Sequence, residues 1–144
     1  MATINEVQDE IIEEFSMFDD WMDRYALLIE LGNSLGKLDD KYKTEDNLIV
    51  GCQSRVWLQA EYIDGKVVFH AESDAVIVKG GIIALLINAL SNRTPDEIIN
   101  ADLYFIEKIG LKENLSPTRS NGLVSMIKQI RFYAMAYKAK EMGE

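Results

Sequence analysis

The sequence predicts an α+β fold in which helices pack on a small antiparallel β-sheet. Helical patterns fill both ends of the chain, and strand-like segments follow one another in the middle without an intervening helix. Strands joined in this way pair antiparallel, whereas a parallel pair needs a long crossover. The 144 residues, 48% of them hydrophobic, suit one core, and we expect a single domain over residues 1–144.

The chain opens with the pattern of an amphipathic helix. Thr3 is followed three residues later by Glu6, which is the spacing of a capping box at a helix N-terminus. Apolar residues then recur at helical spacing and predict one stripe that faces the core. The residues of this stripe are Ile4, Val7, Ile11, Phe15 and Phe18.

A second helical pattern follows closely. It runs from about Asp20 to Leu35, and Gly32 and Gly36 are candidate stops at its C-terminal end. Residues 37–46 are highly charged and lack periodicity, which is typical of a connecting loop. Two helices and a loop are therefore expected before the first strand.

Strand-forming residues dominate the next part of the chain. A short piece at 48–50 comes first, and apolar and polar residues then alternate over 56–62 and again over 67–71. Between the two alternating runs stands Asp64-Gly65, a dipeptide preferred by type I′ hairpin turns. The sequence therefore predicts a β-hairpin within a short meander of about three strands.

Further helices are expected after the hairpin. A Ser-Asp pair at 73–74 can cap a helix over about 75–92 that has almost no polar face, which is typical of the centre of a fold. A Thr-Pro pair at 94–95 and a Ser-Pro pair at 116–117 each place a capping hydroxyl before proline. The last helix is predicted to be long and amphipathic. Its apolar stripe comprises Leu123, Met126, Ile127, Ile130, Tyr133 and Tyr137.

Composition and charge exclude several classes of function. With 24 acidic and 15 basic residues the net charge is −9, which repels phosphate backbones, so no nucleic-acid partner is expected. The first residues lack the pattern of a signal peptide, and no run of about 18 apolar residues occurs. We therefore expect a soluble, cytoplasmic protein with no membrane partner. One cysteine and one histidine do not make a metal-ligand cluster, and no cofactor motif is present, so no cofactor is expected.

The single cysteine, Cys52, admits two interpretations from the residues alone. An unpaired cysteine is often a small buried hydrophobe of the core. Alternatively it is a reactive thiol on a loop, because Gly51 permits a tight turn and Gln53 and Ser54 are polar neighbours that suit a loop. A Cys–His nucleophilic pair would need His70 within hydrogen-bond reach, and we favour a strand-face histidine without a catalytic role.

Three segments of the chain resemble the signature segments of a known family. NLIVGCQSRVW (47–57), ESDAVIVKG (72–80) and LSPTRSNGL (115–123) are similar to those of the SufE/CsdE sulfur-acceptor family. The WMDRYALLIELGNSL helix (21–35) and TPDEI (94–98) are also similar. The resemblance spans most of the chain in one order and implies an IscU/SufE-like α+β fold.

The resemblance also implies a function. Cys52 would accept a persulfide sulfur from a pyridoxal-phosphate-dependent cysteine desulfurase of the SufS/CsdA type. The protein would stimulate that desulfurase and pass the sulfur to a SufBCD-type scaffold that assembles iron–sulfur clusters. It would then be a non-enzymatic carrier, since the pyridoxal phosphate belongs to the partner. The alternative is an IscU-like scaffold or metal-binding module, which is disfavoured because such a site needs about three or four ligands.

Supporting roles follow from the same resemblance. Asp74, Lys79 and Arg119 would fix the cysteine loop or meet the desulfurase, and the Arg119 guanidinium is best suited to favour a thiolate or persulfide anion. The structural alternatives are an N-cap for Asp74 and ordinary surface charges for the other two. The neighbours of the cysteine, which would shape its loop, are Gly51, Gln53 and Ser54.

Two further expectations concern the surroundings of the cysteine. Gly81 stands where the family pattern usually continues with a larger apolar residue, and a second glycine costs about 1 kcal/mol of helix propensity, so the middle helix is expected to be looser. Cys52 is expected to be partly buried at rest and to swing out on docking, because a free persulfide is open to oxidation and reduction.

Overall fold

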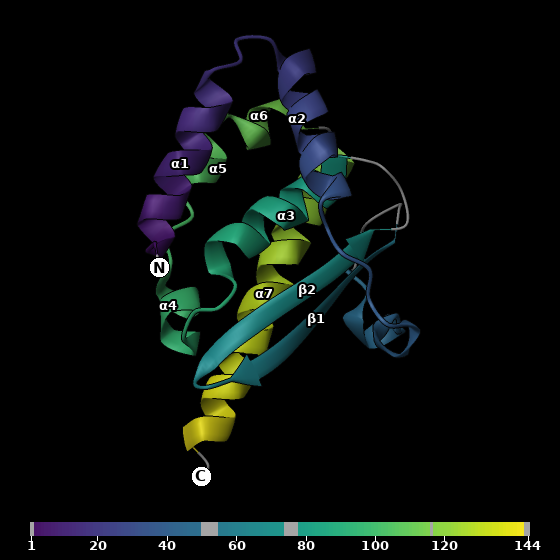
Figure 1. Ribbon diagram of the computed structural model, residues 1–144, viewed down its shortest axis with the longest axis vertical. Helices are drawn as coiled ribbons and strands as arrows, with labels where there is room; N and C mark the ends of the chain where they lie inside the picture. Colours follow the sequence, from purple (N-terminus) through teal and green to yellow (C-terminus); the bar gives the residue numbers. More distant parts are fainter. Residues whose placement is uncertain (1, 50–54, 74–77, 116, 143–144) are drawn as a thin grey trace.

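The computed structural model describes residues 2–49, 55–73, 78–115 and 117–142 (Figure 1). A two-stranded antiparallel hairpin crosses the helices that form the rest of the fold, which confirms the predicted α+β class. The helices and strands are α1 Ile4–Ser16, α2 Trp21–Asn33, β1 Val56–Ile63, β2 Lys66–Ser73, α3 Val78–Leu90, α4 Pro95–Asn100, α5 Phe105–Lys108, α6 Leu111–Asn114 and α7 Pro117–Met142. Two short 3-10 turns, η1 Asp40–Tyr42 and η2 Glu45–Asn47, lie in the predicted loop.

The first helix begins as predicted. Thr3 Oγ1 accepts a hydrogen bond from the Glu6 N–H at 3.1 Å, and the Glu6 carboxylate accepts one from the Thr3 N–H at 3.3 Å. This reciprocal pair satisfies two N–H groups that the helix leaves without an internal partner. Four residues of the predicted stripe, Ile4, Val7, Ile11 and Phe15, are buried along α1. The fifth, Phe18, lies beyond the end of the helix at Ser16 and is half-buried.

The second helix corrects one prediction about its end. Asp20 caps its N-terminus, with the carboxylate accepting from the Met22 N–H at 2.9 Å, but Gly32 is not a stop. It lies inside α2, where a Cβ built on it would stand 2.8 Å from the Gly81 nitrogen of α3. Gly32 therefore serves close helix packing, and the helix ends one residue later at Asn33.

The hairpin confirms the predicted turn. Asp64 and Gly65 have positive φ angles of 52° and 80°, as both central residues of a type I′ turn require. The described part of the predicted piece at 48–50, Leu48 and Ile49, does not form a third strand, and residue 50 lies outside the described residues. Leu48 makes only an isolated bridge to Trp57, so the sheet has two strands among the described residues.

Helix α7 closes the outer edge of β1 with tyrosine hydroxyls. The Tyr133 hydroxyl lies 3.2 Å from the Leu58 carbonyl oxygen, and the Tyr137 hydroxyl donates to the Ala60 carbonyl at 3.1 Å. The two tyrosines are four residues apart, which corresponds to a rise of about 6 Å along a helix, and their two carbonyl partners are two residues apart, which corresponds to about 6.6 Å along a strand. The spacing of the tyrosines on α7 therefore matches the spacing of the carbonyls on β1. At the other edge the Val67 N–H donates to the Arg93 carbonyl at 2.8 Å. Partners of this kind protect strand edges from pairing with other chains.

Helix α3 is the centre of the core, as its apolar composition predicts. Ile83, Leu86 and Leu90 are fully buried, and α3 contacts α2, β2 and α7. The predicted start at residue 75 and the Asp74 cap lie outside the described residues. The glycine at 81 does not simply loosen this helix, because a Cβ there would collide with the Leu28 carbonyl oxygen of α2.

Helices α4 and α7 lie where the sequence predicts them, whereas the short helices α5 and α6 were not predicted. The predicted Ser116 cap of α7 lies outside the described residues. Thr94 and Glu97 form a capping box ahead of α4, with Pro95 at the first helical position. Helix α7 has 26 residues, and its core-facing side buries Leu123, Met126 and Ile130. Within the described ranges, none of the helices combines the length and the apolar character needed to cross a membrane.

Candidate functional site

Most of the predicted site residues lie outside the part of the chain that the structure describes. They are Gly51, Cys52, Gln53, Ser54 and Asp74. Residues 50–54 are called the cysteine segment below. Lys79 is the second residue of α3 and Arg119 the third of α7, and only their backbone positions are described. The site is therefore built from the described residues that border the cysteine segment.

The cysteine segment leaves and rejoins the described chain at one end of the hairpin. Val56 pairs with Ser73 in the last rung of the ladder, so this end carries both the start of β1 and the end of β2. The Ile49 N–H donates to the Val56 carbonyl at 2.8 Å. Ile49 and Val56 are thus fixed side by side, and the chain on both sides of the cysteine segment is anchored to the sheet.

The start of α3 lies at the same end of the hairpin. A Cβ built on Gly80 would stand 3.7 Å from the Cβ of Ser73, so the first turn of α3, which includes Lys79, lies against the end of β2. Two of the three signature segments therefore border one site. Helix α7 runs in the same direction as β1, because Tyr133 contacts Leu58 and the later Tyr137 contacts the later Ala60. The N-terminal turn of α7, which contains Arg119, therefore lies toward this end of the hairpin (Figure 1).

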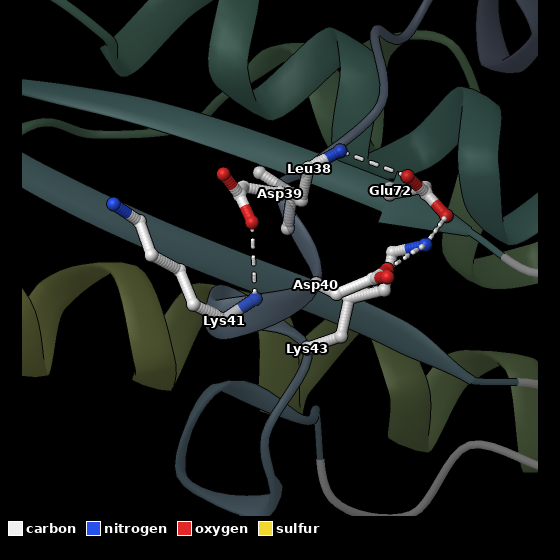
Figure 2. A network of polar contacts seen from close by, with 6 residues as sticks. All are labelled: Leu38, Asp39, Asp40, Lys41, Lys43 and Glu72. Atoms are coloured by element: carbon white, nitrogen blue, oxygen red, sulfur yellow. Dashed lines mark hydrogen bonds and ion pairs between the residues drawn. The ribbon is translucent and has the colours of Figure 1, made fainter.

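A polar network holds the loop before the cysteine segment against the end of β2 (Figure 2). The Glu72 carboxylate accepts a hydrogen bond from the Leu38 N–H at 2.8 Å and pairs with the Lys43 ammonium at 2.7 Å. Lys43 also lies 3.6 Å from the Asp40 carboxylate. Trp57 is the ladder partner of Glu72, and the Lys43 ammonium lies 5.7 Å from the centre of its ring. One carboxylate thus joins three parts of the chain.

The two charges of this network stabilise each other. The hydrogen bond from Lys43 holds the pKa of the Glu72 carboxyl below its ordinary value of 4.5, and the Leu38 N–H acts in the same direction. The same hydrogen bond raises the pKa of Lys43 above its ordinary value of 10.5. Both groups are therefore charged across the neutral range.

Sequence reasoning gave neither Glu72 nor Lys43 a role. Glu72 is part of the ESDAVIVKG segment, but Lys43 stands in a loop with several other charges and no periodicity. Nothing in the order of the residues pairs one loop lysine with one strand glutamate. A weak signal is that Glu72 sits at an alternating strand position directly before the predicted Ser-Asp cap.

His70 lies on the solvent-facing side of β2. Its Nε2 atom is 3.5 Å from a Glu61 carboxylate oxygen, and its side chain is 49% exposed. It also borders an open pocket of about 420 Å³ between α2, α3 and β2, which is lined by Leu35 and Leu38 among others. Glu61 on the neighbouring strand is its described polar neighbour, so the position is that of an exposed strand-face histidine.

A metal centre would need several ligands in one place. Among the described residues, no group of three or more histidine, cysteine, aspartate or glutamate side chains is placed to hold a metal ion. The described polar clusters instead pair carboxylates with lysines and backbone N–H groups.

The fold and the site define a class of small α+β domains in which a hairpin end anchors a segment with a single cysteine. A solved structure of this fold is the solution structure of a hypothetical protein from Thermus thermophilus. It matches with a TM-score of 0.72 and 18% identity, over 90% of this chain and 94% of that chain.

Sequence comparison gives the family. The family described as "SufE: Fe-S metabolism associated domain" matches residues 9–134. An uncharacterized SufE-like protein of Rhizobium etli is 43% identical over 129 residues, which cover 85% of this chain and 86% of that protein. A second uncharacterized SufE-like protein, from Rhizobium meliloti, is 41% identical over 128 residues, or 85% of this chain and 91% of its own length. The chain belongs to the SufE family, whose domain is associated with iron–sulfur metabolism.

Proposed function

We propose that this protein is a sulfur acceptor and carrier that works on Cys52. It takes a sulfane sulfur from the persulfide of a pyridoxal-phosphate-dependent cysteine desulfurase of the SufS/CsdA type, stimulates that enzyme, and passes the sulfur to a SufBCD-type scaffold. The observation that carries the proposal is the SufE family match over residues 9–134, which includes the only cysteine of the chain. The proposal places the protein in the cytoplasm, where thiols stay reduced.

The chemistry needs one thiolate and access to the partner. The Cys52 thiolate attacks the outer sulfur of the partner's persulfide, a new S–S bond forms, and the old S–S bond breaks. The partner's cysteine leaves as a thiolate, and the transferred sulfur keeps its oxidation state. Carbon–sulfur cleavage takes place on the partner's pyridoxal phosphate, so this chain acts as a covalent carrier and not as an enzyme.

A single cysteine suits this task. A second thiol in the same chain would attack the Cys52 persulfide, release sulfide and close a disulfide. The sequence contains one cysteine, so this internal loss of the cargo does not occur. The anchored flanks of the cysteine segment support the proposal further, since a donor must find the thiol in a defined place.

Intact mass spectrometry tests the proposal. The protein is incubated with a SufS/CsdA-type desulfurase and L-cysteine and then weighed without reductant. We expect the wild type to gain the mass of one sulfur atom and Cys52→Ser to gain none, while Asp96→Asn in α4, whose carboxylate pairs with Lys138 of α7, behaves as wild type. Absence of a persulfide adduct on the wild type would contradict the proposal, as would a purified protein that carries a cluster or tightly bound zinc as an IscU-like scaffold does.

A further inference from the structure

The Glu72–Lys43 pair joins two chain segments that lead to the same place. Glu72 is the next-to-last residue of β2, beside the rung at which β1 begins. Lys43 stands six positions before Ile49, and Ile49 is itself hydrogen-bonded to Val56. The stretch 44–48 is therefore fixed at both ends to the sheet. The last described residues before the cysteine segment cannot shift along the hairpin while both attachments hold.

The Leu38 N–H adds a third attachment to the same carboxylate. Leu38 is 34 residues from Glu72 in sequence and lies just beyond the C-terminal end of α2. Its side chain is buried, so its backbone is held from two sides. A carboxylate that accepts both a backbone N–H and an ammonium group makes two charge-assisted hydrogen bonds at once. Glu72 thus ties two points of the loop that follows α2, at Leu38 and at Lys43, to the end of the hairpin (Figure 2).

The surroundings of the pair separate it from an ordinary surface salt bridge. The Glu72 and Lys43 side chains are 16% and 26% exposed, and the Trp57 ring lies beside the ammonium. In contrast, the Lys138–Asp96 pair that joins α7 to α4 is 43% and 63% exposed at 2.5 Å. Exposed pairs of that kind contribute little because water and salt screen them. The second pair therefore provides a matched control with similar chemistry at a distant site.

We infer that Glu72 is a positioning residue, which through Lys43 and Leu38 holds the chain leading to Cys52 in the arrangement from which the thiol accepts sulfur. The effect on sulfur transfer rests on the proposed function, whereas the effect on the reactivity of the thiol does not. Without the carboxylate the loop samples more arrangements, and the competent one is populated for a smaller fraction of the time. The rate of sulfur transfer is proportional to the fraction of molecules in the competent arrangement, just as an apparent binding affinity is proportional to the fraction in the binding-competent state.

Two substitutions test the inference with little change in shape. Glu72→Gln keeps an oxygen that can accept from the Leu38 N–H but removes the charge opposite Lys43. Lys43→Met keeps most of the aliphatic stem and removes the ammonium. Because Cys52 is the only cysteine, its reaction with an aromatic disulfide reagent reports on one site. The second measurement is the rate constant of persulfide transfer from a preloaded desulfurase, well below the unfolding temperature of every variant.

A small disulfide reagent can attack the thiol from any side, whereas the protein donor needs the one competent arrangement. We therefore expect both variants to react at least threefold faster with the disulfide reagent and to accept sulfur at least threefold more slowly than wild type. The double variant should differ little from either single variant, since both remove one interaction. Asp96→Asn should stay within twofold of wild type in both measurements. Circular dichroism confirms that each variant is folded before it is compared.

The possible failures are distinguishable. If both variants react and accept sulfur within twofold of wild type, the pair is only structural and the inference is overturned, whatever their melting temperatures. If the desulfurase loads no sulfur on the wild type while Glu72→Gln still changes thiol labelling, the proposed function fails and the positioning of the thiol by Glu72 stands. Equal changes in Asp96→Asn would show a general charge effect and would also overturn the inference.

Discussion

Gly81 of α3 lies directly against the main-chain carbonyl of Leu28 in α2, so closely that a Cβ built on Gly81 would stand 2.0 Å from that oxygen. Gly32 meets Gly81 at the same crossing. The two helix backbones are therefore in near contact, and α2 is placed where its C-terminal end leads directly to Leu38 and the Glu72 carboxylate. A residue that weakens helix propensity is needed to set the geometry beside the site.

Gly81→Ala is predicted to destabilise the protein despite the better helix propensity of alanine. The added methyl group gains about 1 kcal/mol of propensity. It must however displace the backbone of α2, and overpacking of this kind costs about 1–3 kcal/mol, occasionally more. Because the added Cβ would stand 2.0 Å from a backbone oxygen, the cost lies at the upper end of this range. We therefore expect a net loss of about 2 kcal/mol in the free energy of unfolding, measured by urea denaturation and followed by circular dichroism.

Gly36→Ala is the matched control for this prediction. No atom lies within 4 Å of a Cβ built on Gly36, and its φ angle is not in the left-handed region. Replacing such a glycine reduces the freedom of the unfolded chain and changes stability by about 0.4–1 kcal/mol in the favourable direction. If Gly81→Ala is as stable as Gly36→Ala, the close crossing of α2 and α3 is wrong.

Tyr137→Phe is predicted to lower the free energy of unfolding by about 1 kcal/mol, the usual net value of a lost hydrogen bond. The hydroxyl donates to the Ala60 carbonyl at the edge of β1, and phenylalanine would leave that oxygen without its described partner. Burial raises the pKa of Tyr137 above its ordinary value of 10.0, so the hydroxyl stays a donor at neutral pH. Urea denaturation measures the free energy of unfolding. Phenylalanine keeps the aromatic ring that stacks on Tyr62 at 5.1 Å, so the substitution removes the hydroxyl and leaves the ring packing unchanged.

Tyr133→Phe should cost more, because its hydroxyl donates to the Asn47 side-chain oxygen at 2.7 Å and also accepts a hydrogen bond from the Gln129 side-chain amide at 3.3 Å. The comparison variant is Tyr42→Phe, whose hydroxyl has no hydrogen-bond partner among the described residues. We expect Tyr42→Phe to change stability by less than about 0.5 kcal/mol. Equal losses in all three variants would mean that the edge of β1 is not held by the tyrosine hydroxyls.

Local signals in the sequence predicted those parts of the fold that local physics decides. The capping box at Thr3 and the turn at Asp64-Gly65 depend on residues within a few positions, and both are confirmed. The central burial of α3 follows from its own composition and is also confirmed. Gly32 was wrongly assigned as a helix stop, because a glycine needed for packing and a glycine needed for a cap have the same sequence signal.

The site was only partly predictable, because the contacts around it join segments that are far apart in the sequence. Family-like segments singled out Cys52, whose reactivity stays a prediction because the residue lies outside the described part of the chain. The Glu72–Lys43 pair depends on how a loop folds back on a strand, and no periodicity records that. Of the predicted strand at 48–50, the described residues show a single bridge from Leu48 to Trp57 and no ladder, and residue 50 lies outside the described part of the chain.

His70→Gln is predicted to leave sulfur acceptance within twofold of wild type. The imidazole lies on the exposed face of β2 next to Glu61, and glutamine can occupy the same surface position. A cysteine hydrolase would instead need this histidine as its base. Persulfide loading by intact mass measures the effect. A loss of tenfold or more with a folded protein would show that His70 takes part in the chemistry of Cys52.

The contribution of Glu72 to stability is predicted to depend on pH in a definite window. Its folded pKa is lowered by Lys43, so the stabilisation is present above the unfolded value of 4.5 and is lost as the pH falls through the folded pKa. The pKa of Lys43 is raised by Glu72, so its share is present below 10.5 and is lost as the pH rises through the folded value. The difference in unfolding free energy between wild type and Glu72→Gln should therefore be constant from about pH 5 to pH 10 and shrink at both extremes. Urea denaturation at a series of pH values measures this difference, and Lys43→Met should give a profile of the same shape. A difference that persists undiminished well below the folded pKa of Glu72 would mean that the carboxylate charge is not what holds the loop to β2.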